Sequence, residues 1–248
     1  MNHAHKTQRG FTIIELTLAM MFISFLLLGI ALTIIQIGAV YNKGTTSKEI
    51  NQASRIINTE LNRDALSATS LTLATDYVTT PNTGVAAGGR LCLGSYSYVW
   101  NYARAIETGS ANVTKYTTAP DSTKNSSIRL VKVPDPSRVY CAKTGTGGLL
   151  YPNIRSIDNT LVQELLSNGD HELGIHNFAF ITPVPASSTD ANTGQHIYSL
   201  TYTIGTSKVS ALNATQTACL APNIANADPL YCNVQQFSLV VRAGNGVN

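Results

Sequence analysis

Residues Leu16 to Ile35, which read LTLAMMFISFLLLGIALTII, form an uninterrupted apolar run. No charged residue lies in this run, and its only polar members are Thr17, Ser24 and Thr33. At about 1.5 Å of rise per residue, a helix over this run spans roughly 30 Å, which is the hydrocarbon thickness of a bilayer. The sequence therefore predicts a membrane-spanning helix near the N-terminus.

A cleavable secretory signal is the alternative interpretation of an apolar run so close to the N-terminus. Such a signal has an apolar region of about 7 to 15 residues that ends at an A-x-A-like cleavage site. The run here is longer, and it continues into Gln36, Gly38 and the segment Tyr41-Asn42-Lys43-Gly44 with no A-x-A site. A retained anchor is therefore favoured over a removed signal.

The short segment before the run, MNHAHKTQRG, carries Lys6 and Arg9 and no acidic residue. The positive-inside rule places such a segment on the cytoplasmic side of the membrane and sends the bulk of the chain outward. We therefore expect the residues from Asn42 onward to be extracytoplasmic.

The composition fits an exported protein and argues against nucleic-acid binding. Charged residues make up 12% of the 248 residues, which is well below the usual share of about 25%. The net charge of +3 is small and spread along the chain. The sequence therefore lacks the basic stripe that neutralises nucleic-acid phosphates.

Four cysteines lie in the part that is expected outside the cytoplasm: Cys92, Cys141, Cys219 and Cys232. An even number of cysteines in an oxidising compartment indicates disulfides, and four cysteines allow three pairings. We favour the sequential pairing, because the last two cysteines bracket a short loop. No C-x-x-C pair occurs, so the spacing fits no zinc site, and neither a bound metal nor another cofactor is expected.

The junction before the run, Arg9-Gly10-Phe11-Thr12-Ile13-Ile14-Glu15, carries the most specific signal. Glu15 lies at the margin of an apolar helix, where a carboxylate costs on the order of 2.5 to 3.5 kcal/mol, so a partner is expected unless the side chain extends to the headgroups. A short basic leader, then Gly, Phe, Thr, two aliphatic residues and Glu, resembles the class III signal of type IV pilin-like proteins.

This resemblance implies that prepilin peptidase cuts between Gly10 and Phe11 and that the new amine of Phe11 is methylated. It also implies that the Glu15 carboxylate pairs with the N-terminal ammonium of a neighbouring subunit. A charge pair is far stronger in a low-dielectric helix bundle than in water, and setting register is the best-attested role of buried ionic groups.

The resemblance further implies the organisation, location and partners of the chain. The expected segments are a cleaved leader (1–10), a membrane and assembly helix (11–41), its amphipathic continuation (42–75) and a β-rich head with disulfides (76–248). The expected location is the bacterial inner membrane, crossed once with the C-terminal head in the periplasm, and then the pilus at the cell surface. The expected partners are other minor and major pilins, prepilin peptidase and the inner-membrane assembly platform, with no small-molecule substrate.

Residues 47–74 show apolar positions close to every 3.6 residues, as in an amphipathic helix. Together with the apolar run, this segment predicts one long N-terminal helix, with a candidate break at Asn42-Lys43-Gly44. The apolar positions are Ile50, Ala53, Ile57, Leu61, Ala65 and Ala68.

Beyond Thr75 the sequence changes to short β-rich segments between turn-rich gaps, and several of these segments alternate apolar and polar residues. A short second helix is expected over 158–168, with an Asp or Asn N-cap and Gly169 as the stop. The expected fold class is α+β, with a long N-terminal hydrophobic helix packed on an antiparallel β-sheet head. The expected strands are 96–102, 128–133, 138–142, 175–181, 197–204 and 236–242.

The order of these elements also resembles the larger minor pilins of the W type and the J-type pseudopilins of type II secretion. The similar text is LGIHNFAFITP, followed by a strand and then by QQFSLVVRAGN close to the C-terminus.

The sequence contains no convincing catalytic motif, and an enzyme is not expected. His171 and His176 in HELGIH are five residues apart, whereas two zinc ligands on one face of a zincin helix need i, i+4. Asp170 with Glu172, or Asp228, are candidate calcium ligands, but no EF-hand-type loop occurs. No serine-hydrolase, Walker or Rossmann fingerprint is present.

Trp100 lies among Tyr96, Tyr98 and Tyr102. These aromatic residues form either a stacking platform for sugars or bases or an ordinary strand with one face in the core, and we favour the core.

Two function classes compete. The favoured one is a non-enzymatic minor pilin that helps to initiate or tip a type IV filament, with a minor pseudopilin of type II secretion or DNA uptake as its close neighbour. The other class is a membrane-tethered binding or hydrolytic domain, in which Glu15 has no role beyond the anchor.

Overall fold

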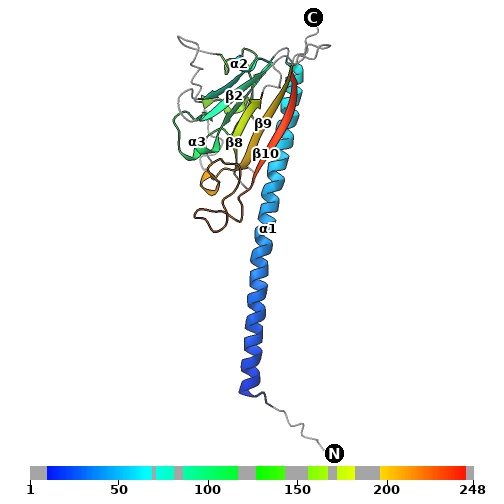
Figure 1. Ribbon diagram of the computed structural model, residues 1–248, viewed down its shortest axis with the longest axis vertical. Coiled ribbons are helices and arrows are strands. Elements are labelled where there is room, and N and C mark those ends of the chain that lie inside the picture. Colours follow the sequence, from blue (N-terminus) through cyan, green and yellow to red (C-terminus); the bar gives the residue numbers. More distant parts are fainter. Residues whose placement is uncertain are drawn as a thin grey trace, which may run out of the picture.

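A single helix, α1 (Ile13–Ser67), extends far beyond the rest of the molecule, and the remaining elements gather around its C-terminal half (Figure 1). The structure is a computed structural model that describes residues 10–68, 71–80, 86–116, 127–142, 156–166, 172–181 and 196–243. The expected break at Asn42-Lys43-Gly44 is absent, because α1 is continuous through these residues.

The described residues of the head form three sheets and several short helices. The first sheet is antiparallel, in the order β1-β2-β3-β5-β7, and the second is antiparallel, in the order β10-β9-β8. A short parallel pair joins β4 to β6. The strands are β1 (Tyr77–Thr80), β2 (Gly88–Leu93), β3 (Tyr96–Asn101), β4 (Lys115–Tyr116), β5 (Leu130–Pro134), β6 (Ser156–Ile157), β7 (Gln163–Glu164), β8 (Leu173–Ile181), β9 (His196–Thr206) and β10 (Val234–Ala243), and the short helices are α2 (Leu73–Asp76), α3 (Ala103–Glu107), η1 (Asn159–Leu161) and η2 (Val209–Ala211).

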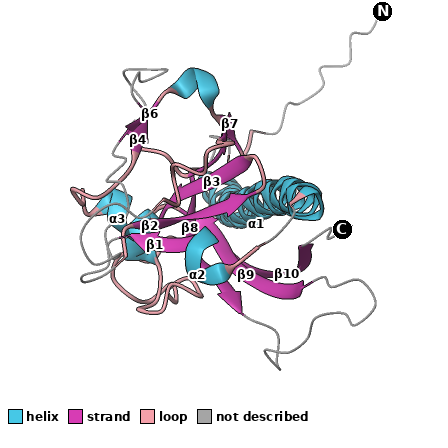
Figure 2. Cartoon of the chain, turned by 90° about the horizontal axis from the view of Figure 1, so that it is seen from above, coloured by secondary structure: helices cyan, strands magenta, loops and turns pink. Residues whose placement is uncertain are grey.

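The C-terminal half of α1 lies against both large sheets, as the view along the helix shows (Figure 2). All six apolar positions that were predicted for its inner face are buried. All of them except Ala68 join one core with side chains from both sheets, including Trp100, Phe178 and Tyr202. The predicted α+β architecture is therefore confirmed: a long N-terminal helix packs on antiparallel sheets.

The first sheet is covered on both faces, which explains the continuous burial of β3. Tyr98 and Trp100 point into the core beside α1, whereas Val99 belongs to a second apolar cluster with residues of β5 and β6. Two covered faces remove the alternation of apolar and polar residues that marks a half-exposed strand.

Five of the predicted strands match β3, β5, β8, β9 and β10 within a few residues. The predicted strand at 138–142 is wrong, because this segment forms turns. The Asp135 carboxylate accepts hydrogen bonds from the backbone N–H groups of Val139 and Tyr140, which satisfies them without a partner strand.

The predicted second helix at 158–168 is also wrong within the described residues. The segment forms η1 and then β7, which pairs with the edge of the first sheet at β5. The N–H of Leu165 donates to the carbonyl oxygen of Leu130, and Leu165 and Leu166 are buried beside a strand, whereas Leu161 is 55% exposed.

The amphipathic segment ends as a helix earlier than predicted. Helix α1 stops at Ser67, where Ala68 is extended and its N–H donates to the carbonyl oxygens of Asp64 and Ala65. Strand β2 was missed by the sequence pattern. A Cβ atom added at Gly88 would lie 2.1 Å from the carbonyl oxygen of Trp100, and one at Gly89 would lie 2.3 Å from the Trp100 ring, so the close approach of β3 requires both glycines.

Candidate functional site

The junction residues form the N-terminal cap of α1. Thr12 is the N-cap, and its hydroxyl oxygen accepts a hydrogen bond from the N–H of Glu15 at 3.3 Å. In return, Oε2 of Glu15 accepts from the N–H and from the hydroxyl of Thr12, both at 3.0 Å. This reciprocal arrangement is a capping box, which satisfies helix-end donors that otherwise lack partners.

The capping box fixes the position of the Glu15 carboxylate relative to Phe11. An acid in the first turn of a helix is also favoured by the helix dipole. Glu15 and Phe11 are both exposed, and Phe11 precedes the helix with 89% of its surface accessible. Within the described residues, the Glu15 carboxylate accepts hydrogen bonds from Thr12 alone. The carboxylate is therefore open to a partner from another molecule.

The first half of α1 is bare of contacts with the head. Every residue from Gly10 to Ile37 is exposed, and an 18-residue window in α1 reaches a mean hydropathy of 2.7. The helix is long and apolar enough to cross a membrane. The hydroxyls of Thr17, Ser24 and Thr33 donate to backbone carbonyl oxygens of the preceding turn at 2.7 to 2.9 Å, so they do not have to be satisfied by solvent.

The second half of α1 is tied to the head by a buried ionic network. Lys132 of β5 places its Nζ 2.5 Å from Oδ2 of Asp64 and 2.9 Å from Oε2 of Glu60, and the Lys132 and Asp64 side chains are each only 3% exposed. The hydroxyl of Tyr98 donates to Oδ2 of Asp64 at 2.6 Å. Burial, followed by this hydrogen bond, raises the pKa of Tyr98, so the phenol remains a donor. The network joins α1 to β3 and β5. Lys132 and Asp64 are almost completely buried, Glu60 is 13% exposed, and Arg63, which is 61% exposed, pairs with both carboxylates on the solvent side.

A second polar contact joins α1 to the other sheet. The hydroxyl of Tyr202 on β9 donates to Oδ1 of Asn58 at 2.8 Å and lies 2.9 Å from the hydroxyl oxygen of Ser54. Burial raises the pKa of Tyr202 to about 12. The two polar contacts hold the helix in one register against both sheets.

Asp64, Lys132 and Tyr202, which hold α1 in its register against the sheets, were not predicted from the sequence. A signal for Asp64 was present, because it lies two helical turns after Ile57 on the apolar face and a buried carboxylate needs a partner. Lys132 gave a weaker signal as a charge in the otherwise apolar LVKV segment of β5. Which carboxylate meets which amine depends on the packing of distant strands, which the sequence does not display.

Two disulfides close the head, in the sequential pairing that the loop spacing favoured. Cys92 of β2 is bonded to Cys141 in the turns after β5, with Cα atoms 6.3 Å apart. Cys219 is bonded to Cys232, with Cα atoms 6.0 Å apart. The first disulfide secures the turn segment to the first sheet, and the second closes the loop between η2 and β10.

The aromatic platform interpretation of Trp100 is wrong. Trp100 is 1% exposed, and its ring centroid lies 4.3 Å from that of Phe178. Tyr98 is fully buried, and Tyr96, at 37%, is the most exposed of the four aromatic residues. Trp100 and Tyr98 fill the core beneath α1, Tyr102 packs against it, and a single exposed tyrosine does not form a stacking platform for a ligand.

The HELGIH segment enters strand β8 at Leu173, so Glu172 and His176 do not share a helix. His171 and the calcium candidate Asp170 lie outside the described residues. The described residues contain no group of three or more His, Cys, Asp or Glu side chains that could hold a metal ion. Asp228 instead accepts the backbone N–H groups of Leu230 and Tyr231.

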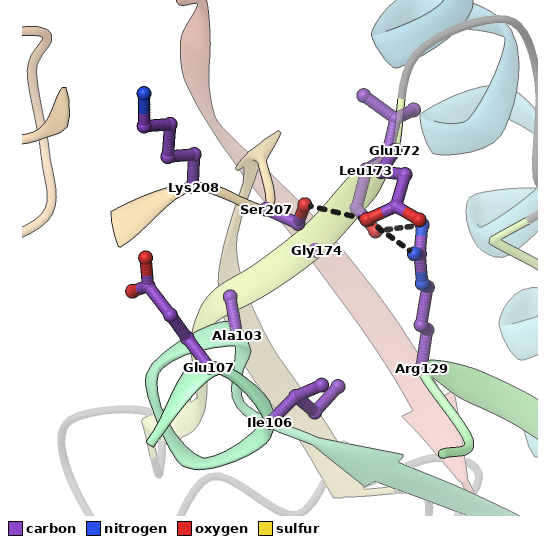
Figure 3. A pocket seen from close by; sticks show the side chains of 9 residues that line it. All are labelled: Ala103, Ile106, Glu107, Arg129, Glu172, Leu173, Gly174, Ser207 and Lys208. Atoms are coloured by element: carbon purple, nitrogen blue, oxygen red, sulfur yellow. Dashed lines mark hydrogen bonds and ion pairs between the residues drawn. The ribbon is translucent and has the colours of Figure 1, made fainter. Parts of the chain in front are cut away.

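A small polar hollow of about 270 Å³ lies between α3, the start of β8 and the end of β9 (Figure 3). Its buried cation, Arg129, is already paired: Nη2 lies 3.1 Å from Oε2 of Glu172, and Nη1 donates to the carbonyl oxygen of Leu173 at 2.9 Å. Ser207 donates to the same carboxylate at 3.2 Å. The close-up shows these paired groups on one wall, with Lys208 and Glu107 across the hollow.

The strongest functional arrangement is therefore the N-terminal one, in which a capped and exposed carboxylate heads a bare apolar helix that is firmly built into a head. No protein-family model matches the chain, and no significant similarity to a curated protein or to a solved structure was found.

Proposed function

We propose that this chain is a non-enzymatic structural subunit of a type IV filament, a minor pilin that helps to initiate or tip the pilus. One observation carries the proposal: the Gly10-to-Glu15 junction leads without a break into a 55-residue helix that is bare and apolar in its first half and built into the head in its second.

A bare apolar rod of this length requires apolar surroundings. Before assembly a lipid bilayer supplies them, and after assembly the apolar helices of neighbouring subunits supply them. The same helix serves in both states because the head contacts it only beyond the apolar run, so transfer from lipid to filament leaves the head's core untouched.

The position of Glu15 supports its proposed role in assembly. A carboxylate inside an apolar bundle is costly unless it is paired. The capping box holds Glu15 about one helical turn from Phe11, which would carry the processed amine. The same spacing in a neighbouring subunit offers an ammonium, and pairing the two sets the axial stagger between subunits.

The proposed location is the bacterial inner membrane, with the head in the periplasm, followed by the pilus at the cell surface. Lys6 and Arg9 favour a cytoplasmic N-terminus, and the two disulfides fit an oxidising compartment outside the cytoplasm. Prepilin peptidase, other pilins and the inner-membrane assembly platform are the proposed partners.

Processing is the direct test of this proposal. Incubation of the full chain with prepilin peptidase, followed by N-terminal sequencing, is expected to give a product that begins at Phe11. Gly10→Val should block cleavage, because a branched side chain would then precede the scissile bond. Gly29→Val is the matched control, since a Cβ at either glycine meets no atom within 4 Å. A product that begins at any other residue defeats the proposal.

Glu15→Ala separates a filament subunit from a tethered domain. For a pilin, this variant should insert into the membrane at normal levels but fail to enter filaments, whereas a domain that is merely tethered should keep both its location and its activity. Deletion of the gene distinguishes a pilus from a secretion system, because the first loses surface filaments and the second loses exported substrate proteins.

A further inference from the structure

The loop between η2 and β10, residues 213–233, extends from the head toward the bare half of α1 (Figure 1). We call it the foot loop. The Cys219–Cys232 disulfide closes it, and the Asn213 side-chain oxygen accepts from the N–H groups of Thr217 and Ala218. The ring of His176 on β8 lies within 3.2 Å of Oε1 of Gln216. The foot loop therefore has a defined conformation and a fixed position beside α1.

The foot loop reaches the level of α1 at which the apolar run has just ended. Asp228 and Tyr231 line a hollow of about 520 Å³ together with Asn42 of α1. Asn42 follows Ile35 by about two helical turns, or roughly 10 Å along the axis. The polar layer of a bilayer is roughly 5 to 8 Å deep on each side of the hydrocarbon core. If Leu16 to Ile35 fills the core, Asn42 lies about 2 to 5 Å beyond the polar layer, and the foot loop that shares a hollow with it lies at the membrane surface.

At this level the foot loop exposes apolar side chains. Ile224, Leu230 and Tyr231 are 49%, 39% and 40% exposed. Asp228 is the only charged residue of the loop, and its Oδ1 already accepts the N–H groups of Leu230 and Tyr231 at 3.2 and 3.0 Å. Tyrosine and aliphatic side chains on a surface of low charge suit the interfacial layer, where aromatic residues of membrane proteins gather.

The charges around the loop favour phosphate headgroups over a basic partner. Lys208 lines the same hollow and is exposed, and Lys43 is exposed on α1 immediately after Asn42. The acidic residue Glu172, which also lines the hollow, is paired with Arg129. Exposed lysines near a membrane surface are attracted to anionic lipids.

We propose that the foot loop docks into the headgroup layer of the same bilayer that holds α1, with Ile224, Leu230 and Tyr231 as its contact residues. The proposal rests on the membrane anchoring set out above. With the helix as one attachment and the foot loop as the other, the head is held at a fixed tilt on the membrane. Extraction of the subunit into a filament then removes the foot loop from lipid.

The test uses full-length protein reconstituted singly into vesicles of phosphatidylcholine with phosphatidylglycerol. Tyr231→Trp places a reporter on the foot loop, Phe25→Trp one in the middle of the apolar run, and Val139→Trp one on an exposed site, 50% accessible, in the turns after β5. The native Trp100 is buried in the head and supplies the common background. Quenching is measured with lipids that carry a spin label either at the headgroup or deep in the acyl chain.

The headgroup label should quench most of the emission added by Tyr231→Trp, and contact with lipid should shift this emission to the blue. The deep label should quench Phe25→Trp, and neither label should affect Val139→Trp. Omission of phosphatidylglycerol should weaken the effect at Tyr231. If Phe25→Trp is quenched but Tyr231→Trp behaves like Val139→Trp, the foot loop does not dock and the anchor stands. If Phe25→Trp is not quenched, anchoring and docking both fail. If the emission of Tyr231→Trp changes with the number of protein molecules per vesicle but not with the spin label, the residue contacts another copy of the protein. This result also overturns the proposal.

Discussion

Lys132 places a positive charge inside the head, between the helix and the first sheet. Removing a lysine side chain from water is costly, and its proximity to Asp64 and Glu60 offsets that cost only while all three groups keep their positions. A charge network of this kind contributes less to net stability than its short distances suggest. Its stronger effect is to make any other register of α1 unfavourable, because a shifted helix would leave buried charges without partners.

Lys132→Met tests this network, because methionine fills a similar volume without the charge. We expect a loss of about 3 to 5 kcal/mol in the free energy of unfolding, because Asp64 and Glu60 lose their buried ammonium partner and keep only Arg63, which is 61% exposed. Lys115→Met is the control, because Lys115 is exposed on β4 and its replacement should have little effect. Both are measured by denaturant unfolding in detergent. A loss below about 1 kcal/mol for Lys132→Met would mean that the network is solvated.

We expect His176, which contacts Gln216 of the foot loop, to make the stability of the head depend on pH. Burial lowers the pKa of His176, although its contacts with Gln216 and the Thr206 carbonyl oxygen and the charge of Glu107 oppose the shift. The unfolded chain, with a histidine pKa near 6.5, therefore binds the proton more readily than the folded chain. The contribution of His176 is present above about pH 6.5 and is lost as the pH falls below that value toward the folded-state pKa.

We expect His176→Gln to reduce the loss of stability between pH 7 and pH 5, because glutamine keeps a polar side chain but does not titrate. Thermal unfolding of both proteins at the two pH values gives the comparison. Carboxylates contribute equally to both proteins, so the difference between the two pH effects isolates His176. Equal pH effects in the two proteins would show that His176 does not control this transition.

At the scale of elements, the inner face of α1 supplies much of the core. Ile57 is fully buried against both sheets, whereas the adjacent Ile56 is 48% exposed. Ile57→Ala should lower the free energy of unfolding by about 2 to 5 kcal/mol through lost burial and a residual cavity. Ile56→Ala, the same change one residue earlier, should stay within about 0.5 kcal/mol. Both losses are measured by chemical denaturation. If they are similar, α1 must present a different face to the sheets.

The sequence predicts correctly those elements whose apolar pattern matches the face that is buried in the folded protein. The 3.6-residue spacing from Ile50 to Ala68 marks the inner face of α1, and the apolar content of β8, β9 and β10 marks a sheet. Strand β2 escapes prediction because its glycines are poor strand formers that are needed for contact with Trp100. The segment after Asp158 looks helical because Leu161, Leu165 and Leu166 are spaced as on one face of a helix, but the pairing of β7 with distant β5 decides its structure.

The candidate site also contains one part that the sequence predicts and one part that only the fold shows. The junction from Gly10 to Glu15 is contiguous, so its capping residues and its spacing can be identified directly in the sequence. The coupling of α1 to the head joins residues that are far apart, as in Asp64 with Lys132 and Ser54 with Tyr202. Local patterns carry no information on such pairs, and only the folded sheets bring them together.

At the scale of the whole molecule, the head and the bare half of α1 are structurally separate parts of one chain. The first buried residue of α1 is Thr46, whose hydroxyl donates to the carbonyl oxygen of Asn42 at 3.0 Å. Every residue from Gly10 to Ile37 is exposed. The core of the head therefore does not depend on the apolar run, although it does depend on the second half of the same helix.

Truncation tests this division. A fragment that begins at Asn42 should fold in aqueous buffer without detergent and unfold at nearly the same temperature as the full chain, because its core is complete. A fragment that begins at Ala68 lacks Ile50, Ile57, Leu61 and the carboxylates that pair with Lys132. It should remain unfolded, because folding would leave one sheet face uncovered and would bury Lys132 without its partners. Near-ultraviolet circular dichroism from the packed Trp100 reports folding in both fragments. A disordered Asn42 fragment would mean that the apolar half stabilises the head, and a folded Ala68 fragment would mean that α1 is not part of its core.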